Sequence, residues 1–167
     1  DQINRNNVNQ LRMVWTRDLA IDTGEITPLA YNGMLFIPQA NDTIQAVDAE
    51  SGDLIWQYRR RIPDDLVEMV GSGASNNRNL AIYKNLIINT SADSFVFALD
   101  ALTGETVWET QILDYKVNSA LQSSGPIIAD GRVISGRSCR PRGGPDACIV
   151  TAHDANNGDE LWRRRLI

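Results

Sequence analysis

The sequence predicts an all-β fold, a β-propeller of four-stranded antiparallel blades, of which this chain of 167 residues supplies about three. Three observations lead to this prediction: a motif that occurs three times, a hairpin signal before each copy, and no convincing amphipathic helix pattern anywhere. A four-stranded unit that recurs every 40–50 residues or so is typical of propeller blades.

The repeated motif reads Ala-Val-Asp-Ala-Glu-Ser-Gly-Asp-Leu-Ile-Trp at 46–56 and returns at 98–108 and 152–162. Asp, Ala, Gly and Trp keep one spacing in all three copies, and the Trp residues are 52 and 54 residues apart. The Asp side chain can accept bonds from backbone N–H groups ahead of it, and Gly suits a turn position with positive φ. We therefore expect each copy to be a hairpin whose Trp packs against the neighbouring blade.

A second hairpin precedes each copy of the motif. Asn32-Gly33 and Asp130-Gly131 separate short apolar runs and are strong signals of a two-residue turn, and Lys84-Asn85 takes the same place in the second unit. Two hairpins make one four-stranded sheet.

The blades are therefore expected near 25–60, 78–112 and 123–165, after a starting strand around 11–15. A closed propeller needs about four to eight blades. We expect residues 1–167 to form the N-terminal part of one larger propeller domain, with the remainder of the ring as their partner.

Charge and hydropathy argue against two classes of partner. The net charge is −5, whereas nucleic-acid-binding proteins usually carry a basic surplus. No apolar run approaches the roughly 20 residues of a membrane-spanning helix. Two Arg triplets, 59–61 and 163–165, are expected to be solvated strand ends. His153, inside the third motif, is expected to be a strand residue and not a base.

Both cysteines lie in a loop rich in Gly, Pro and Arg. From the hairpin turn to the motif Asp there are 15 residues in each of the first two blades and 23 in the third, so the third blade carries an insertion of eight. A disulfide between Cys139 and Cys148 would stabilise the fold by about 2–3 kcal/mol and would need an oxidising compartment. Two free thiols are the alternative. A zinc site is less favoured, because the chain has one His.

The motif Ala-x-Asp-Ala-x-x-Gly-x-x-x-Trp resembles the tryptophan-docking motif of quinoprotein alcohol dehydrogenases. These are eight-bladed periplasmic propellers that use pyrroloquinoline quinone (PQQ) with calcium or, in some members, a lanthanide. The segment Gly-Glu-Ile-Thr-Pro-Leu at 24–29 also resembles theirs, and the resemblance covers essentially the whole chain.

The resemblance implies a periplasmic enzyme that oxidises an alcohol to an aldehyde or ketone and passes electrons to a cytochrome c or similar acceptor. Because the chain begins with Asp1 and not Met, it is consistent with a processed secretory protein or with a trimmed fragment. The alternative function is a non-catalytic propeller that acts as a protein-binding scaffold in the cell envelope, because fold alone does not fix function.

The resemblance implies four cofactor-binding residues. Glu25 matches a Glu that contacts the quinone, and Arg78, after Asn77, matches an Arg that contacts the quinone oxygens. A fixed cation there would stabilise the negative charge that develops on a quinone oxygen. Ser123 replaces a Thr that binds a PQQ carboxylate, and Ser138 matches a further Ser or Asn. Structural alternatives are an exposed hairpin acid at 25, a blade-to-blade salt bridge at 78 and a turn hydroxyl at 123.

The sequence also departs from the family pattern. Adjacent cysteines that form a disulfide under the cofactor in many members are replaced by Ser72-Gly73. A metal-binding Glu is replaced by Pro141, with Asp146 a weak substitute. The metal ligands in this segment are therefore unknown. The catalytic Asp and the metal-binding Asn of the family lie after residue 167, so we expect no catalytic residue here.

Overall fold

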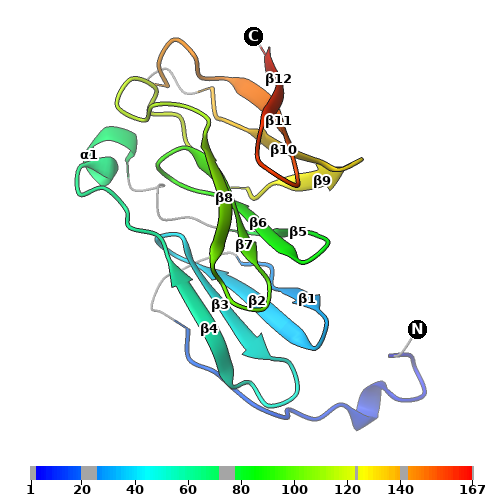
Figure 1. Cartoon of the computed structure of the whole chain (residues 1–167). Helices are drawn as coiled ribbons and strands as arrows, with labels where there is room; N and C mark the ends of the chain where they lie inside the picture. Colours follow the sequence, from blue (N-terminus) through cyan, green and yellow to red (C-terminus); the bar gives the residue numbers. More distant parts are fainter. Residues whose placement is uncertain (1–2, 20–25, 72–77, 123, 140–142, 167) are drawn as a thin grey trace.

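Three four-stranded antiparallel sheets make up the computed structural model, which describes residues 3–19, 26–71, 78–122, 124–139 and 143–166 (Figure 1). Within each sheet the strands are hydrogen-bonded in chain order, and the sheets stand one beside the next as blades. This architecture confirms the predicted fold class. Blade 1 holds β1 (Leu29–Tyr31), β2 (Met34–Gln39), β3 (Thr43–Asp48) and β4 (Leu54–Arg59); blade 2 holds β5 (Ala81–Tyr83), β6 (Leu86–Thr90), β7 (Phe95–Asp100) and β8 (Thr106–Gln111); blade 3 holds β9 (Ile127–Ala129), β10 (Arg132–Gly136), β11 (Ile149–Asp154) and β12 (Glu160–Arg165).

The motif turns form as the residue types predict. The Asp48 carboxylate accepts bonds from the backbone N–H groups of Glu50 and Ser51 at 2.9 and 2.8 Å. These bonds favour the ionised form, so they lower the pKa of Asp48. The following Gly52 has φ 79°, a conformation that glycine adopts without steric cost.

Each motif Trp docks on the next blade, as predicted. Trp56 donates from Nε1 to the Ala101 carbonyl at 3.0 Å. A Cβ on Gly104 would lie 2.7 Å from the Trp56 ring, so only glycine leaves room for the indole. Trp108 packs on the equivalent Gly158. Two apolar clusters fill the interfaces, one between blades 1 and 2 around Phe36, Trp56 and Phe97, and one between blades 2 and 3 around Ile88, Trp108 and Ile149.

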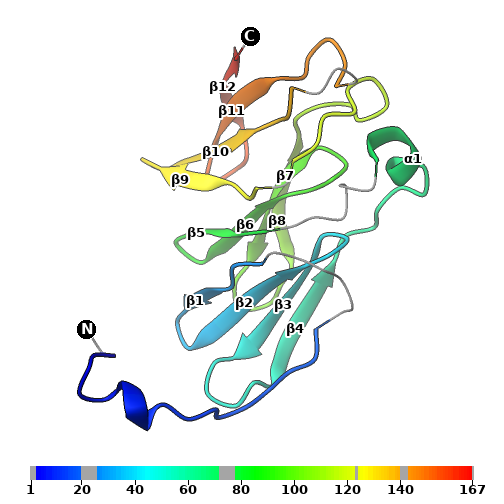
Figure 2. The ribbon, with the colours of Figure 1, turned by 180° about the vertical axis from the view of Figure 1, so that it is seen from behind.

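The prediction of a starting strand at 11–15 was wrong. After a short 3-10 helix, η1 (Val8–Gln10), residues 11–19 carry no strand hydrogen bonding. An extended segment becomes a strand only beside a partner, and none lies beside it among the described residues. Trp15 nevertheless docks on blade 1 as Trp56 does on blade 2, donating to the Ala49 carbonyl at 3.2 Å and packing on Gly52. Figure 2 shows this N-terminal segment running along blade 1.

One short helix was also missed: α1 (Leu66–Val70), in the connection between blades 1 and 2. Five residues are too few to show a helical period in the sequence. Leu66 and Val70, one turn apart, pack with Tyr115 and Leu121 in a third apolar cluster. In the described part of the chain, no helix is long and apolar enough to cross a membrane.

Antiparallel order gives the blades two distinct ends. One end, called here the motif end, carries the first hairpin turns and the motif turns. The opposite end, called here the loop end, carries the β2–β3, β6–β7 and β10–β11 connections, the segments between blades, and α1 (Figure 1). Arg78 and Ser138, the two predicted cofactor residues that the structure describes, both lie in loop-end segments.

Candidate functional site at the loop end

The starts of the three blades are hydrogen-bonded to one another at the loop end. The Arg78 backbone carbonyl accepts a bond from the Thr27 backbone N–H at 2.7 Å, and Thr27 forms a parallel bridge with Asn79. The Asn79 side-chain oxygen accepts from the Gly125 N–H at 2.9 Å. A Cβ on Gly125 would collide with the Asn79 backbone, so glycine permits this close approach.

Three of the predicted cofactor residues, Glu25, Arg78 and Ser123, are at or near these contacts in the sequence. Arg78 is half-buried where blades 1 and 2 meet. Glu25 and Ser123 lie outside the described residues. Each stands two positions before a residue of the hydrogen-bonded set, Thr27 and Gly125 respectively. Their roles therefore stay predictions.

Ser138 joins the β10–β11 connection to the segment before blade 3. Its Oγ accepts a bond from the Leu121 N–H at 3.0 Å, and its own N–H donates to the Leu121 carbonyl at 3.0 Å. Because a hydroxyl is both donor and acceptor, its proton is still available for another partner. Arg78 and Ser138 lie at the same end of the sheets, in different blades.

The structure contains the predicted disulfide between Cys139 and Cys148. The inserted loop is held against the connection between blades 2 and 3, because the Asp146 N–H donates to the Asn118 side chain at 2.8 Å. Asp146 itself forms an ion pair with Arg165 at 3.0 Å. Its role as a substitute metal ligand therefore finds no support in its contacts.

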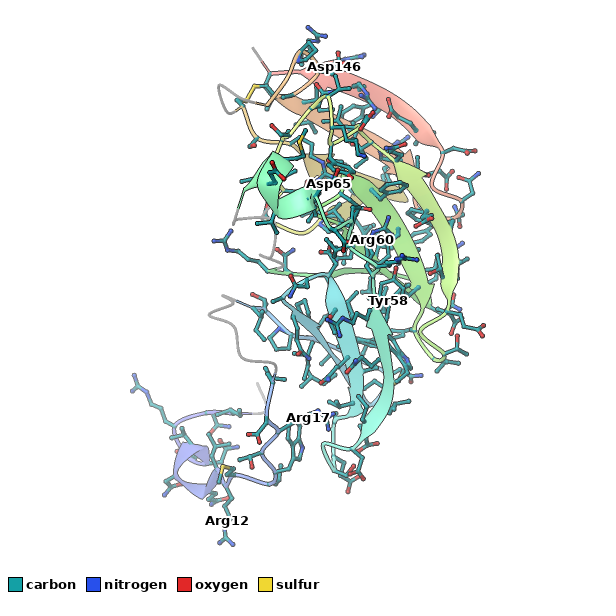
Figure 3. The ribbon with its side chains drawn as sticks, turned by 90° about the vertical axis from the view of Figure 1, so that its left-hand side faces the viewer. Arg12, Arg17, Tyr58, Arg60, Asp65 and Asp146 are labelled. Atoms are coloured by element: carbon teal, nitrogen blue, oxygen red, sulfur yellow. A yellow bond between two sulfur atoms is a disulfide. The ribbon has the colours of Figure 1, made fainter. Side chains whose placement is uncertain are left out.

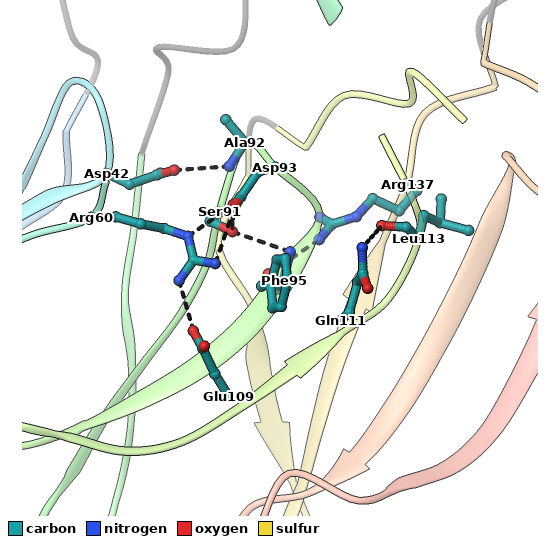
Figure 4. Close-up of polar contacts among 10 residues, drawn as sticks. All are labelled: Asp42, Arg60, Ser91, Ala92, Asp93, Phe95, Glu109, Gln111, Leu113 and Arg137. Carbon is teal, nitrogen blue, oxygen red and sulfur yellow. Dashed lines mark hydrogen bonds and ion pairs between the residues drawn. The ribbon is translucent and has the colours of Figure 1, made fainter. Parts of the chain in front are cut away.

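A buried polar network joins the three blades at the loop end, and the sequence did not predict it (Figure 4). Asp42, in the β2–β3 turn, accepts from the Ala92 N–H of the β6–β7 turn at 2.8 Å. Arg60 binds Asp93 at 2.8 Å and Glu109 at 2.9 Å. Arg137 reaches blade 2 from blade 3, donating to the Phe95 carbonyl at 3.3 Å.

Arg60 corrects the prediction that the Arg triplets are solvated. Its side chain is only 10% exposed, lying 4.5 Å from the centre of the Phe95 ring. The physical reason is alternation: Tyr58 and Arg60 point to the same side, toward blade 2, while Arg59 is exposed (Figure 3). In the second triplet, Arg163 likewise donates to a blade 2 carbonyl, that of Ile112, at 2.8 Å.

Burial shapes the electrostatics of this network. It raises the pKa of Asp42 to about 7, with the Asp93 charge adding to the effect, while the Ala92 N–H, Arg60 and Arg137 oppose it. It also lowers the pKa of Arg137 to about 10, although the charges of Asp42 and Asp93 favour the cation. His153, as expected, is a packed strand residue, and burial lowers its pKa.

Two of the predicted cofactor residues lie in described segments at the loop end. Arg78 offers a cation and Ser138 a hydroxyl proton at one end of the sheets. The described ranges hold no group of three or more His, Cys, Asp or Glu side chains that could bind a metal. A cavity of about 420 Å³ is lined by Asn41, Arg59, Arg60, Arg61 and Ile62, and neither Arg78 nor Ser138 belongs to this lining.

Comparison with known proteins gives the same family as the motif. The family described as PQQ-dependent glucose/ethanol/alcohol dehydrogenase, β-propeller domain, matches residues 1–166. Quinoprotein alcohol dehydrogenase PedH of Pseudomonas putida is 31% identical over 175 residues, covering 100% of this chain and 28% of PedH. The dehydrogenase subunit of the alcohol dehydrogenase (quinone) of Komagataeibacter europaeus is 35% identical over 169 residues, covering 98% of this chain and 22% of that subunit.

A solved structure agrees with the sequence relatives. A europium-containing methanol dehydrogenase superposes with a TM-score of 0.80 at 26% identity, over 98% of this chain and 28% of that one. The chain thus spans between 22% and 28% of the length of these three proteins. With the repeat, the three docked blades and a family match over nearly every residue, the chain belongs to the PQQ-dependent dehydrogenase β-propeller family and forms part of its ring.

Proposed function

We propose that this chain is part of a periplasmic PQQ-dependent dehydrogenase that oxidises an alcohol to an aldehyde or ketone. The observation that carries the proposal is the family match over residues 1–166, with Arg78 at the loop end where the blade starts converge. Relatives that are 31% and 35% identical carry the names of quinone-dependent alcohol dehydrogenases.

PQQ, when bound, would supply the acceptor for the two electrons removed from the alcohol. The Arg78 guanidinium would bind the quinone oxygens and stabilise negative charge there. Glu25 and Ser123, which precede Thr27 and Gly125 by two positions in the sequence, would orient the cofactor. Ser138 would donate its remaining hydroxyl proton to a cofactor carboxylate while its oxygen holds Leu121.

The metal, the electron acceptor and the compartment belong to the same proposal. We infer Ca²⁺ or a lanthanide beside PQQ, and a europium-containing relative supports the second choice. A cytochrome c or similar carrier would take the electrons. The Cys139–Cys148 disulfide supports the periplasm, because such bonds persist in oxidising compartments.

Reconstitution tests the proposal. The full-length protein would be purified without PQQ and then given PQQ with Ca²⁺ or with a lanthanide, before dye reduction is measured with primary and secondary alcohols. We expect dye reduction only when alcohol, PQQ and one of the metals are all present. A folded protein that neither binds PQQ nor reduces dye with either metal would contradict the proposal and favour the scaffold alternative.

A further inference from the structure

We infer that Arg137 is a positioning residue for the cofactor end of blade 3, holding Gln122 and, through it, Ser124 of the segment 121–125 in place from within the blade interface. The inference rests on the proposed function, because this segment contains Ser123. Arg137 is only 3% exposed, and its backbone N–H donates to the Ile149 carbonyl at 2.8 Å, which ties it to β11.

The Arg137 side chain reaches the segment through Gln122. One guanidinium nitrogen donates to the Gln122 side-chain oxygen, and the Gln122 amide nitrogen donates in turn to the Ser124 carbonyl. Both ends of the Gln122 amide are therefore engaged, which fixes which atom faces Arg137. Gln122 and Ser124 stand on either side of Ser123 in the sequence, so Arg137 restrains both chain neighbours of a predicted cofactor residue.

The next residue repeats the connection. Ser138 exchanges two hydrogen bonds with Leu121, so two consecutive residues of the β10–β11 connection hold two consecutive residues before blade 3. The second guanidinium nitrogen of Arg137 donates to the Phe95 carbonyl of blade 2 at 3.3 Å. The segment is thus fixed relative to blade 2 as well as to blade 3.

The propeller itself does not require a cation at this position. Counted from the first hairpin turn, the same place in blades 1 and 2 holds Gln39 and Ser91, which are uncharged. Burying a guanidinium costs free energy unless it is well paired, and the Arg137 Nε has no hydrogen-bond partner. The other two guanidinium nitrogens donate to the Gln122 side-chain oxygen and to the Phe95 carbonyl. We therefore attribute the burial of Arg137 to its contacts with Gln122 and Phe95 at the loop end.

The test uses full-length protein prepared without PQQ and compares wild type, Arg137→Met, Arg137→Lys and the control Arg163→Met. Arg163 also donates from blade 3 across the blade interface, and its side chain bonds to the Ile112 carbonyl and to Glu160 instead of Gln122. Hydrogen exchange of the peptide covering 119–126 and the dissociation constant of PQQ would both be measured.

We expect Arg137→Met to speed exchange in this peptide and to weaken PQQ binding about 10–100-fold, as loss of supporting contacts does at other cofactor and metal sites. Arg137→Lys should restore part of both, and Arg163→Met should stay within about twofold of wild type in PQQ affinity, because its contacts lie elsewhere. Gln122→Met removes the same contact but keeps the Arg137 guanidinium. If Arg137→Met does not fold, Gln122→Met should likewise speed exchange and weaken PQQ binding.

Wild-type exchange and PQQ affinity in both Arg137→Met and Gln122→Met would overturn the inference. Equal losses in Arg163→Met would also overturn it, since general weakening of the blade interface would then suffice. If wild type itself binds no PQQ, the proposed function fails, and the exchange measurement still decides whether Arg137 holds the segment.

Discussion

At the residue scale, Asp42 differs from the Asp residues of the motif turns because its side chain is buried. It lies in a tight turn with φ 50° and is 2% exposed. Its carboxylate accepts a bond from the Ala92 N–H, and the charges near it include Asp93, Arg60 and Arg137. Because Arg60 is paired with Asp93 and Glu109, Asp42 receives little compensation for burial.

Asp42 should make the protein less stable as pH rises. Burial raises its pKa from 3.8 to about 7, so the folded state holds the proton more tightly than the unfolded state does. Its contribution to stability is therefore fully present below the unfolded value and is lost as pH rises toward about 7. Asp42→Asn keeps an acceptor for Ala92 and tolerates positive φ. We expect the unfolding temperature of this variant to fall less than that of wild type between pH 4 and pH 7.

Asp48→Asn is the control for this pH prediction. Backbone N–H groups lower the Asp48 pKa, so its contribution is present above the unfolded value and is lost as pH falls through the folded one. Its removal should therefore reduce the loss of unfolding temperature on acidification below about pH 5 and leave the change between pH 5 and pH 7 as in wild type. Identical pH profiles for wild type and Asp42→Asn would show that Asp42 is not a buried, titrating carboxyl.

The buried network also shows how far residue-level prediction could go. Strand alternation after Trp56 places Tyr58 and Arg60 on one side, so the burial of Arg60 was within reach of the sequence pattern. The approach of Asp42 and Arg137, near enough for their charges to interact, was not predictable from the sequence. It depends on turns from three blades arriving at one place, and nothing local in the sequence encodes that approach.

At the element scale, the docking motif was largely predictable because each copy repeats the same local chemistry. The repeat gave the hairpins, the Asp turns and the Trp contacts. It did not give α1, which is too short to show a period, or the conformation of 11–15, which depends on whether a partner strand is present. Trp15 docks on Gly52 although residues 11–15 form no strand. The apolar residues around Trp15 do not by themselves show whether the segment is a strand.

The docking glycine offers a direct test at this scale. Gly104 and Gly33 have nearly the same φ, 74° and 77°, so an Ala at either one has a similar backbone penalty of about 1–2 kcal/mol. A Cβ on Gly104 would also lie 2.7 Å from the Trp56 ring, whereas Gly33 has no atom within 4 Å. We expect Gly104→Ala to cost about 1–3 kcal/mol more than Gly33→Ala, from overpacking. Equal unfolding temperatures for the two variants would exclude a rigid Trp cradle.

The inserted loop of blade 3 gives a second test at the scale of elements. Cys139 and Cys148 are nine residues apart, and opening so short a loop in the unfolded chain should cost about 2–3 kcal/mol of stability. We expect the Cys139→Ser/Cys148→Ser variant to unfold at a lower temperature than wild type under oxidising conditions. With a reductant present the two proteins should unfold alike, and a difference that persists there would assign the effect to the serines.

At the scale of the whole molecule, the two ends of the blades have different roles. The motif end carries repeated turns with the same chemistry in all three blades. The loop end differs from blade to blade, through α1, the buried network and the disulfide loop. The repeat predicted a partial ring, and the family resemblance predicted where a cofactor would bind. Glu25 and Ser123 stay predictions from that resemblance, because their structure is not described.

The central claim is that PQQ binds at the loop end through Arg78. The most direct measurement is the PQQ dissociation constant of the full-length protein, compared among wild type, Arg78→Met and Arg132→Met. Arg132 lies at the motif end, where it pairs with Asp130. The account predicts that Arg78→Met binds PQQ at least about tenfold more weakly, as expected for a lost charge-assisted contact, and that Arg132→Met binds as wild type does. Wild-type affinity in Arg78→Met, or weakened binding in Arg132→Met alone, would contradict it.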